Sequence, residues 1–138
     1  MTDVSTVSRT FAAEQRRIAE IRDFIDEILS GCVSAEFLTM FKLIADEILA
    51  NVSMYAYDDD ADKWLEVSIS VKGGVAFMAF SDEGKPFDPM SAPEPDTDLS
   101  AEERELGGLG IYIVKNLVDE TSYSREDGRN ILTIKKKI

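Results

Sequence analysis

The stretch that decides the fold is Gly107-Gly108-Leu109-Gly110, which leads into the apolar run Ile111-Tyr112-Ile113-Val114-Lys115-Asn116-Leu117-Val118. A glycine cluster before an apolar run predicts a helix whose first N–H groups are exposed. Such a helix start carries partial positive charge and attracts phosphate. The cluster matches neither a Walker-type loop nor a complete dinucleotide-binding fingerprint, so a tightly packed helix start with no ligand is the alternative interpretation.

The composition of the chain limits the classes of protein to which it can belong. The chain has 138 residues, the size of one domain, and its net charge of −12 opposes binding to nucleic acids or anionic membranes. It has no histidine, which excludes a phosphohistidine carrier and a histidine base. The single cysteine, Cys32, cannot form an intrachain disulfide, and the sequence shows neither a signal peptide nor an apolar run of about 20 residues. These features predict a cytoplasmic protein.

Hydrophobic periodicity predicts the order of helices and strands. Apolar residues recur every three or four positions over 12–29 and 34–57, which predicts two amphipathic helices, and the glycine-entered helix runs to about residue 119. Alternating patterns predict an edge strand and two hairpins, over residues 4–11, 65–72 with 75–80, and 121–126 with 130–136. Gly73-Gly74 and Asp127-Gly128 are the expected turns. This order predicts an α+β fold, a two-layer sandwich with helices on one face of a mixed, mainly antiparallel sheet.

Two polar side chains share one face of the second predicted helix, which Ser34 is expected to cap. Glu47 and Asn51 lie one turn apart and are flanked by apolar residues, so we expect them not to be freely solvated. Lys42 and Asp46 fall on another face, where they are expected to form a surface ion pair of little energetic value.

A long irregular segment separates Asp82, at the end of the second hairpin strand, from the glycine cluster. Residues 83–106 contain all four prolines of the chain and many carboxylates. Long loops inside compact domains are usually functional or disordered. We therefore expect a lid over residues 83–106.

Three motifs in this order resemble those of the Bergerat-fold ATP-binding superfamily, which includes DNA gyrase, heat-shock chaperones, mismatch-repair ATPases and histidine kinases. Glu47-x-x-x-Asn51 resembles its N box, Asp82-x-Gly84 its G1 box and Gly108-x-Gly110 its G2 box. The resemblance covers roughly residues 35–138, with 1–138 expected to be a single ATP-binding domain. Within the superfamily, the segments at 82–89 and 107–112 look most like the anti-sigma-factor serine/threonine kinases.

The resemblance implies how the adenine base would be held. Asp82 would accept a hydrogen bond from the adenine amino group. Gly84 would let the base lie flat against the backbone. Thr133, on the last predicted strand, would support the adenine contact.

The resemblance also implies how ATP phosphates and Mg²⁺ would be held. Gly107, Gly108 and Gly110 would cradle phosphates through their N–H groups, and Arg104 in the lid could reach the γ-phosphate. Asn51 would hold Mg²⁺ together with the phosphates. Magnesium commonly takes few protein ligands, so one amide oxygen is chemically reasonable.

The implied activity is phosphorylation of a protein. Glu47 would orient or deprotonate the attacking hydroxyl, as a carboxylate beside a hydroxyl can. The implied partners are a sigma factor, which is sequestered, and a small antagonist protein, which is phosphorylated on Ser or Thr; a homodimer is also implied. Two alternatives stay open: a non-catalytic ATP-binding switch that sequesters a partner, and a histidine-kinase-type catalytic domain that acts on another chain.

Overall fold

The computed structural model describes residues 3–57, 62–88 and 106–138, with only the backbone for Tyr55 and for residues 106–111. In this part of the chain a five-stranded sheet has the order β1-β2-β3-β5-β4, and every pair is antiparallel. The strands are β1 (Val4–Ala12), β2 (Trp64–Lys72), β3 (Val75–Asp82), β4 (Glu120–Glu126) and β5 (Arg129–Lys137). The helices are α1 (Ile18–Leu29), α2 (Ala35–Asn51) and α3 (Leu106–Leu117), with short turns η1 (Gln15–Arg17) and η2 (Val52–Ala56).

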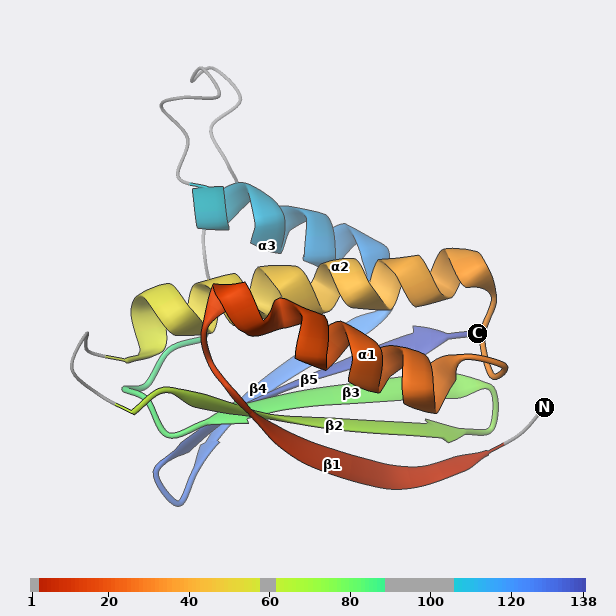
Figure 1. Ribbon diagram of the computed structural model, residues 1–138, viewed down its shortest axis with the longest axis horizontal. Coiled ribbons are helices and arrows are strands. Elements are labelled where there is room, and N and C mark those ends of the chain that lie inside the picture. Colours follow the sequence, from red (N-terminus) through yellow and green to blue (C-terminus); the bar gives the residue numbers. More distant parts are fainter. Residues whose placement is uncertain (1–2, 58–61, 89–105) are drawn as a thin grey trace.

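The helices form one layer and the sheet forms the other (Figure 1). α2 lies in the middle of the helical layer and packs against both α1 and α3. The predicted α+β two-layer sandwich is therefore confirmed, with β1 at an edge and β3 in the centre. The expectation of a mixed sheet is corrected, because all described strand pairs are antiparallel. In the described residues no helix is long and apolar enough to cross a membrane.

Both predicted hairpin turns are present. Gly73 and Gly74 have φ angles of 58° and 78°, and Asp127 and Gly128 have φ angles of 51° and 76°. Two successive residues with positive φ make the turn whose twist matches that of the flanking strands. This geometry favours glycine and explains the sequence at both positions.

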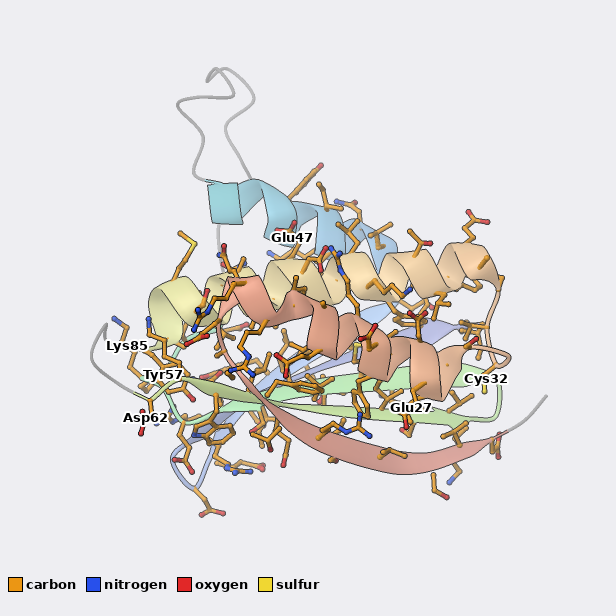
Figure 2. All side chains as sticks on the ribbon, in the orientation of Figure 1. Glu27, Cys32, Glu47, Tyr57, Asp62 and Lys85 are labelled. Atoms are coloured by element: carbon orange, nitrogen blue, oxygen red, sulfur yellow. The ribbon has the colours of Figure 1, made fainter. Side chains whose placement is uncertain are left out.

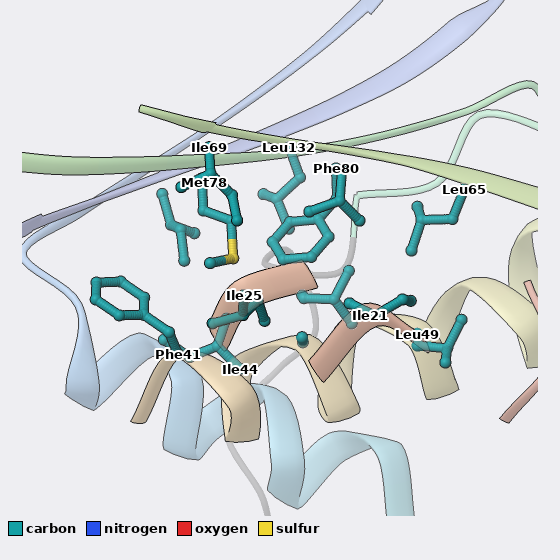
Figure 3. Packing of buried hydrophobic residues seen from close by; sticks show 14 of the residues in the cluster. Ile21, Ile25, Phe41, Ile44, Leu49, Leu65, Ile69, Met78, Phe80 and Leu132 are labelled. Carbon is teal, nitrogen blue, oxygen red and sulfur yellow. The ribbon is translucent and has the colours of Figure 1, made fainter. Parts of the chain in front are cut away.

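The core lies between the sheet and the helices (Figure 3). Exposure alternates along β2 and β5, so that every second side chain points toward the helices. The largest fully buried side chains come from α1, α2, β2 and β3: Ile21, Phe24, Ile25, Leu29, Phe41, Ile44, Ile48, Leu49, Leu65, Ile69 and Met78. Val114 of α3 is also fully buried, which attaches that helix to the same core.

The first helix starts later than the periodicity predicts. Residues 12–17 were expected to be helical, but β1 continues to Ala12, which pairs with Trp64. The N–H of Ala13 then donates to the carbonyl of Lys63 at 3.0 Å, which extends the strand contact by one residue. Pairing with β2 and burial of Ala13 outweigh the local helical preference.

The second helix begins as predicted. Ser34 has extended backbone angles, and its Oγ accepts a hydrogen bond from the N–H of Phe37 at 3.1 Å. The expected Lys42–Asp46 pair is wrong, because both side chains reach across to α1. Lys42 Nζ lies 2.7 Å from Asp26, and the guanidinium of Arg22 binds Asp46 through two of its nitrogens.

The packing predicts a stability difference between two neighbouring positions on α2. Phe41 is 1% exposed and lies in the core, whereas Leu43 is 38% exposed. Phe41→Ala is expected to lower the free energy of unfolding by about 3–5 kcal/mol, because it removes buried contacts and leaves a cavity. Leu43→Ala, the matched control, should lower it by about 1 kcal/mol or less. Urea denaturation followed by circular dichroism measures both; equal losses would contradict the assignment of the core.

Candidate nucleotide-binding site

The end of α2 presents the first predicted motif. Asn51 is the last residue of α2 and is only 4% exposed. Its Nδ2 donates to the carbonyl of Glu47 at 2.8 Å, which turns the amide so that Oδ1 is the atom left for another group. The chain continues as η2, a π-helical turn, and such turns are frequent at functional sites.

Glu47 lies one turn before Asn51, on the side of α2 next to α3 (Figure 2). It is half-buried. Burial raises the pKa of the Glu47 carboxyl, and the neighbouring charge of Asp46 raises it further. A raised pKa makes the ionised carboxylate a better proton acceptor.

Asp82 ends β3 and is only 4% exposed. Within the described part of the chain it accepts two hydrogen bonds, from the N–H of Gly84 at 2.8 Å and from Nδ2 of Asn130 at 2.9 Å. Both end on Oδ1, so Oδ2 is the acceptor atom left for a ligand. Burial raises the pKa of Asp82, while Asn130, Gly84 and the charge of Arg125 act in the opposite direction.

Asn130 is a site residue that sequence reasoning missed. It stands on β5 directly opposite Asp82. The two hairpin turns set the registers of β2 with β3 and of β4 with β5, but no hairpin joins β3 to β5. The pairing of Asp82 with Asn130 is therefore given only by the sheet itself.

Thr133 does not lie beside Asp82 in the structure. Asn130, Leu132 and Ile134 are the buried positions of β5, so they face the helices, and the alternation of side chains puts Thr133 on the opposite face of the sheet. Thr133 pairs with Ala79 rather than Asp82. Asn130 occupies the place beside Asp82 that Thr133 was expected to take.

Gly84 brings the loop after β3 into contact with the end of η2. A Cβ at this position would lie 2.1 Å from the carbonyl oxygen of Ala56, so no other residue fits without moving the backbone. The next N–H, of Lys85, donates to that same carbonyl at 2.8 Å. The side of Gly84 where a side chain would point is therefore filled by protein, which is a reason for glycine different from the expected close approach of a base.

Two further side chains hold this loop. The hydroxyl of Tyr57 accepts from the N–H of Glu83 at 3.0 Å and donates to the carbonyl of Trp64 at 2.8 Å. From the other side, a guanidinium nitrogen of Arg125 donates to the carbonyl of Gly84 at 2.7 Å. Figure 2 shows Tyr57 and Lys85 close to this end of α2 and η2. The end of α2 and the end of β3 are thereby joined through direct contacts.

A small cavity of about 10 Å³ lies between α2 and the ends of the strands. Its lining is apolar apart from one carboxylate, one amide and one phenol: Ile48, Val52, Phe80, Asp82, Phe87, Tyr123, Asn130 and Leu132. An apolar lining with a few convergent polar groups is also found in small-molecule sites, although those are far larger than this cavity. Larger hollows of about 360 and 620 Å³ lie along β1 and beside η2, but they are open and contain neither Asp82 nor Asn51.

The glycine cluster forms the start of α3. The helix begins at Leu106, so Gly107 and Gly108 are among the four residues whose N–H groups lack intrahelical partners. Gly110 lies one residue further on, inside the intrahelical hydrogen-bonding pattern. Figure 1 shows α3 running antiparallel to α2, with its first turn on the same side of the molecule as the end of α2. Arg104 and residues 89–105 of the expected lid lie outside the described residues.

Known proteins are similar to this chain in sequence. A family model described as a histidine kinase-like ATPase domain matches residues 11–136. The serine/threonine-protein kinase BtrW of Bordetella bronchiseptica is 27% identical over 101 residues, which cover 73% of this chain and 71% of that protein. The anti-sigma F factor of Geobacillus stearothermophilus is 24% identical over 100 residues, covering 72% of this chain and 68% of that protein.

A solved structure shares the fold. The RsbU and RsbW domains of Rv1364c from Mycobacterium tuberculosis superimpose with a TM-score of 0.67 at 16% sequence identity, over 96% of this chain and 32% of that one. The present chain thus spans about a third of the solved chain. The family model, however, spans nearly the whole present chain, and it agrees with the resemblance drawn from the N-box, G1 and G2 motifs. This chain belongs to the histidine kinase-like ATPase domain family.

Proposed function

We propose that this chain is an ATP-dependent anti-sigma factor and protein serine/threonine kinase that phosphorylates a small antagonist protein. The observation that carries the proposal is the buried carboxylate of Asp82, held at an apolar cavity beside the helix that bears Glu47 and Asn51. The relatives named above, a serine/threonine kinase and an anti-sigma F factor, support the choice of reaction.

Asp82 is the proposed base-recognition residue. Its Oδ2 accepts a hydrogen bond from the amino group of adenine, while Oδ1 stays bound to Gly84 and Asn130. A cavity of about 10 Å³ holds roughly one water molecule, so the base enters only when part of the lining moves. Phe87 is the lining residue outside the helices and strands, and its displacement makes the room.

The start of α3 is the proposed phosphate site. The N–H groups of Gly107 and Gly108 are free of intrahelical bonds and lie at the positive end of the helix dipole. In the described conformation Gly110 contributes flexibility to this turn rather than a free donor. Arg104, two residues before α3, adds positive charge for the γ-phosphate.

Asn51 is the proposed protein ligand of Mg²⁺. The bond from Nδ2 to the Glu47 carbonyl leaves Oδ1 as the atom for the ion, and amide oxygens are suitable ligands for this hard cation. Nucleotide phosphates complete the coordination. When bound, the ion neutralises charge on the transferring phosphoryl group.

Glu47 is the proposed general base. Its half-buried carboxylate, one turn from Asn51, removes the proton of the Ser or Thr hydroxyl that attacks the γ-phosphate. If no transfer occurs, the same site serves a non-catalytic switch in which ATP shapes a partner-binding surface. A histidine-kinase-type domain acting on another chain is distinguished by its phosphohistidine product.

The proposed partners are a sigma factor and a small antagonist protein, in the cytoplasm, with this chain acting as a homodimer. The net charge of −12 fits partners with basic surfaces and opposes direct contact with nucleic acid or anionic membranes. Incubation with a small antagonist protein and labelled ATP tests the proposal directly. Acid-stable label on Ser or Thr is the expected product.

Asp82→Ala tests recognition of the base. It leaves the adenine amino group without its acceptor, which should cost about 1.5–3 kcal/mol in binding of Mg-ADP. Thr133→Ala, on the opposite face of β5, is the matched control and should bind as the wild type does. Titration calorimetry measures both, and unchanged affinity in the Asp82 variant would remove this residue from the site.

Glu47→Gln tests the general base. The substitution keeps the shape of the side chain but removes its basicity, so Mg-ATP binding should persist while phosphoryl transfer falls by about 10²–10⁴-fold. Single-turnover transfer of labelled phosphate gives the rate. Wild-type transfer by this variant would mean that Glu47 is not the base.

Asn51→Ala tests the proposed metal ligand, and here the expected change is in the affinity for ATP rather than in the rate of transfer. Affinity for ATP should fall in the presence of Mg²⁺, because one oxygen ligand is lost, and change little with excess EDTA. Calorimetry with and without EDTA measures the affinity for ATP in the absence and in the presence of the metal. An equal loss under both conditions would show that Asn51 supports the helix rather than the metal.

A further inference from the structure

Asn130 uses its entire hydrogen-bonding capacity. An asparagine side chain has two N–H donors and an oxygen that accepts two bonds. Nδ2 donates to Asp82 Oδ1 at 2.9 Å and to the carbonyl of Lys85 at 2.8 Å. Oδ1 accepts from the N–H of Phe87 at 3.2 Å and from the hydroxyl of Tyr123 at 2.5 Å. The residue is 3% exposed, so these bonds are shielded from water.

These four bonds allow only one orientation of the amide. If it flipped, Oδ1 would face the carboxylate of Asp82 and the carbonyl of Lys85, which are both acceptors, and the N–H groups would face the N–H of Phe87. A buried mismatch of this kind leaves several groups unsatisfied. In this structure Asn130 therefore presents a donor to Asp82.

A fixed donor beside Asp82 favours the ionised carboxylate, because an N–H group binds a lone pair and not a proton. The other polar and charged groups around Asp82 are Arg125 and Tyr123 of β4, Tyr57 after η2, and Glu83 and Lys85 in its own loop. Among the described side chains of α2 and η2, those of Ile48 and Val52 line the cavity, and both are apolar. Burial has the largest effect and raises the pKa of Asp82, and the hydrogen bonds on Oδ1 oppose this rise.

We propose that Asn130 determines base selectivity by keeping Asp82 a hydrogen-bond acceptor. An acceptor pairs with the 6-amino group of adenine and repels the 6-oxo group of hypoxanthine or guanine, whereas a protonated Asp82 could donate to the oxo group. The inference rests on the proposed function, in which Asp82 contacts the base. Asn130 acts through Asp82 and is a positioning residue.

The test compares ATP with inosine triphosphate, which differs from ATP at position 6 of the base. Calorimetry across a pH series uses the wild type, Asn130→Ala and Tyr123→Phe, with Thr133→Ala as the control on the same strand. For Asn130→Ala we expect ATP affinity to fall at least about tenfold and the ATP-to-ITP ratio to shrink. We also expect ATP binding to be lost at a higher pH than in the wild type, because removing the donor raises the pKa of Asp82 and binding requires its ionised form.

Tyr123→Phe keeps the ring but removes the donor to Asn130, so it should change the same quantities in the same direction by less. If circular dichroism shows that Asn130→Ala does not fold, the Tyr123→Phe variant alone tests the proposed role of Asn130. An unchanged ATP-to-ITP ratio and pH profile in the folded variants would overturn the inference, while the proposed function would stand if Asp82→Ala still loses binding. Absence of ATP binding by the wild type would overturn both.

Discussion

The antiparallel pairing of β3 with β5 is the constraint on which the rest of the structure depends. It is the pairing that joins β1-β2-β3 to the β4–β5 hairpin in one sheet. The same register sets Asp82 opposite Asn130, at the end of β3 beside the loop that leads toward α3. A shift by one residue would turn Asn130 to the other face and leave Asp82 buried without its side-chain partner.

The loop after β3 connects the sheet to the helical layer through direct contacts. Gly84 lies against Ala56, and Tyr57 contacts both Glu83 and the first residue of β2. The loop that follows the proposed base-recognition residue is therefore held against η2 and Tyr57 by direct contacts.

A buried carboxylate and amide are costly unless their polar atoms are paired. Here Asn130 is fully paired and Asp82 is paired on one oxygen. Among the described residues the only buried side-chain nitrogen or oxygen without a partner is the hydroxyl of Ser81. Asp82 lines the apolar cavity, and its other oxygen is the acceptor that we propose for the base.

The sequence by itself determined what local patterns encode: the two hairpin turns, the Ser34 cap, the α+β class, and the three motifs that indicated the family, which the family match confirms. The roles assigned to Glu47, Asn51 and Asp82 remain predictions. Only the tertiary structure decided which strands are neighbours, and therefore that Asn130 and not Thr133 lies beside Asp82. It also decided that β1 extends to Ala12 and that Lys42 and Asp46 pair with α1. The physical reason is that turns and helix caps depend on residues that are close in sequence. The order of the strands, the face of the sheet to which a side chain points, and the ion pairs between helices depend on contacts between residues far apart in the chain.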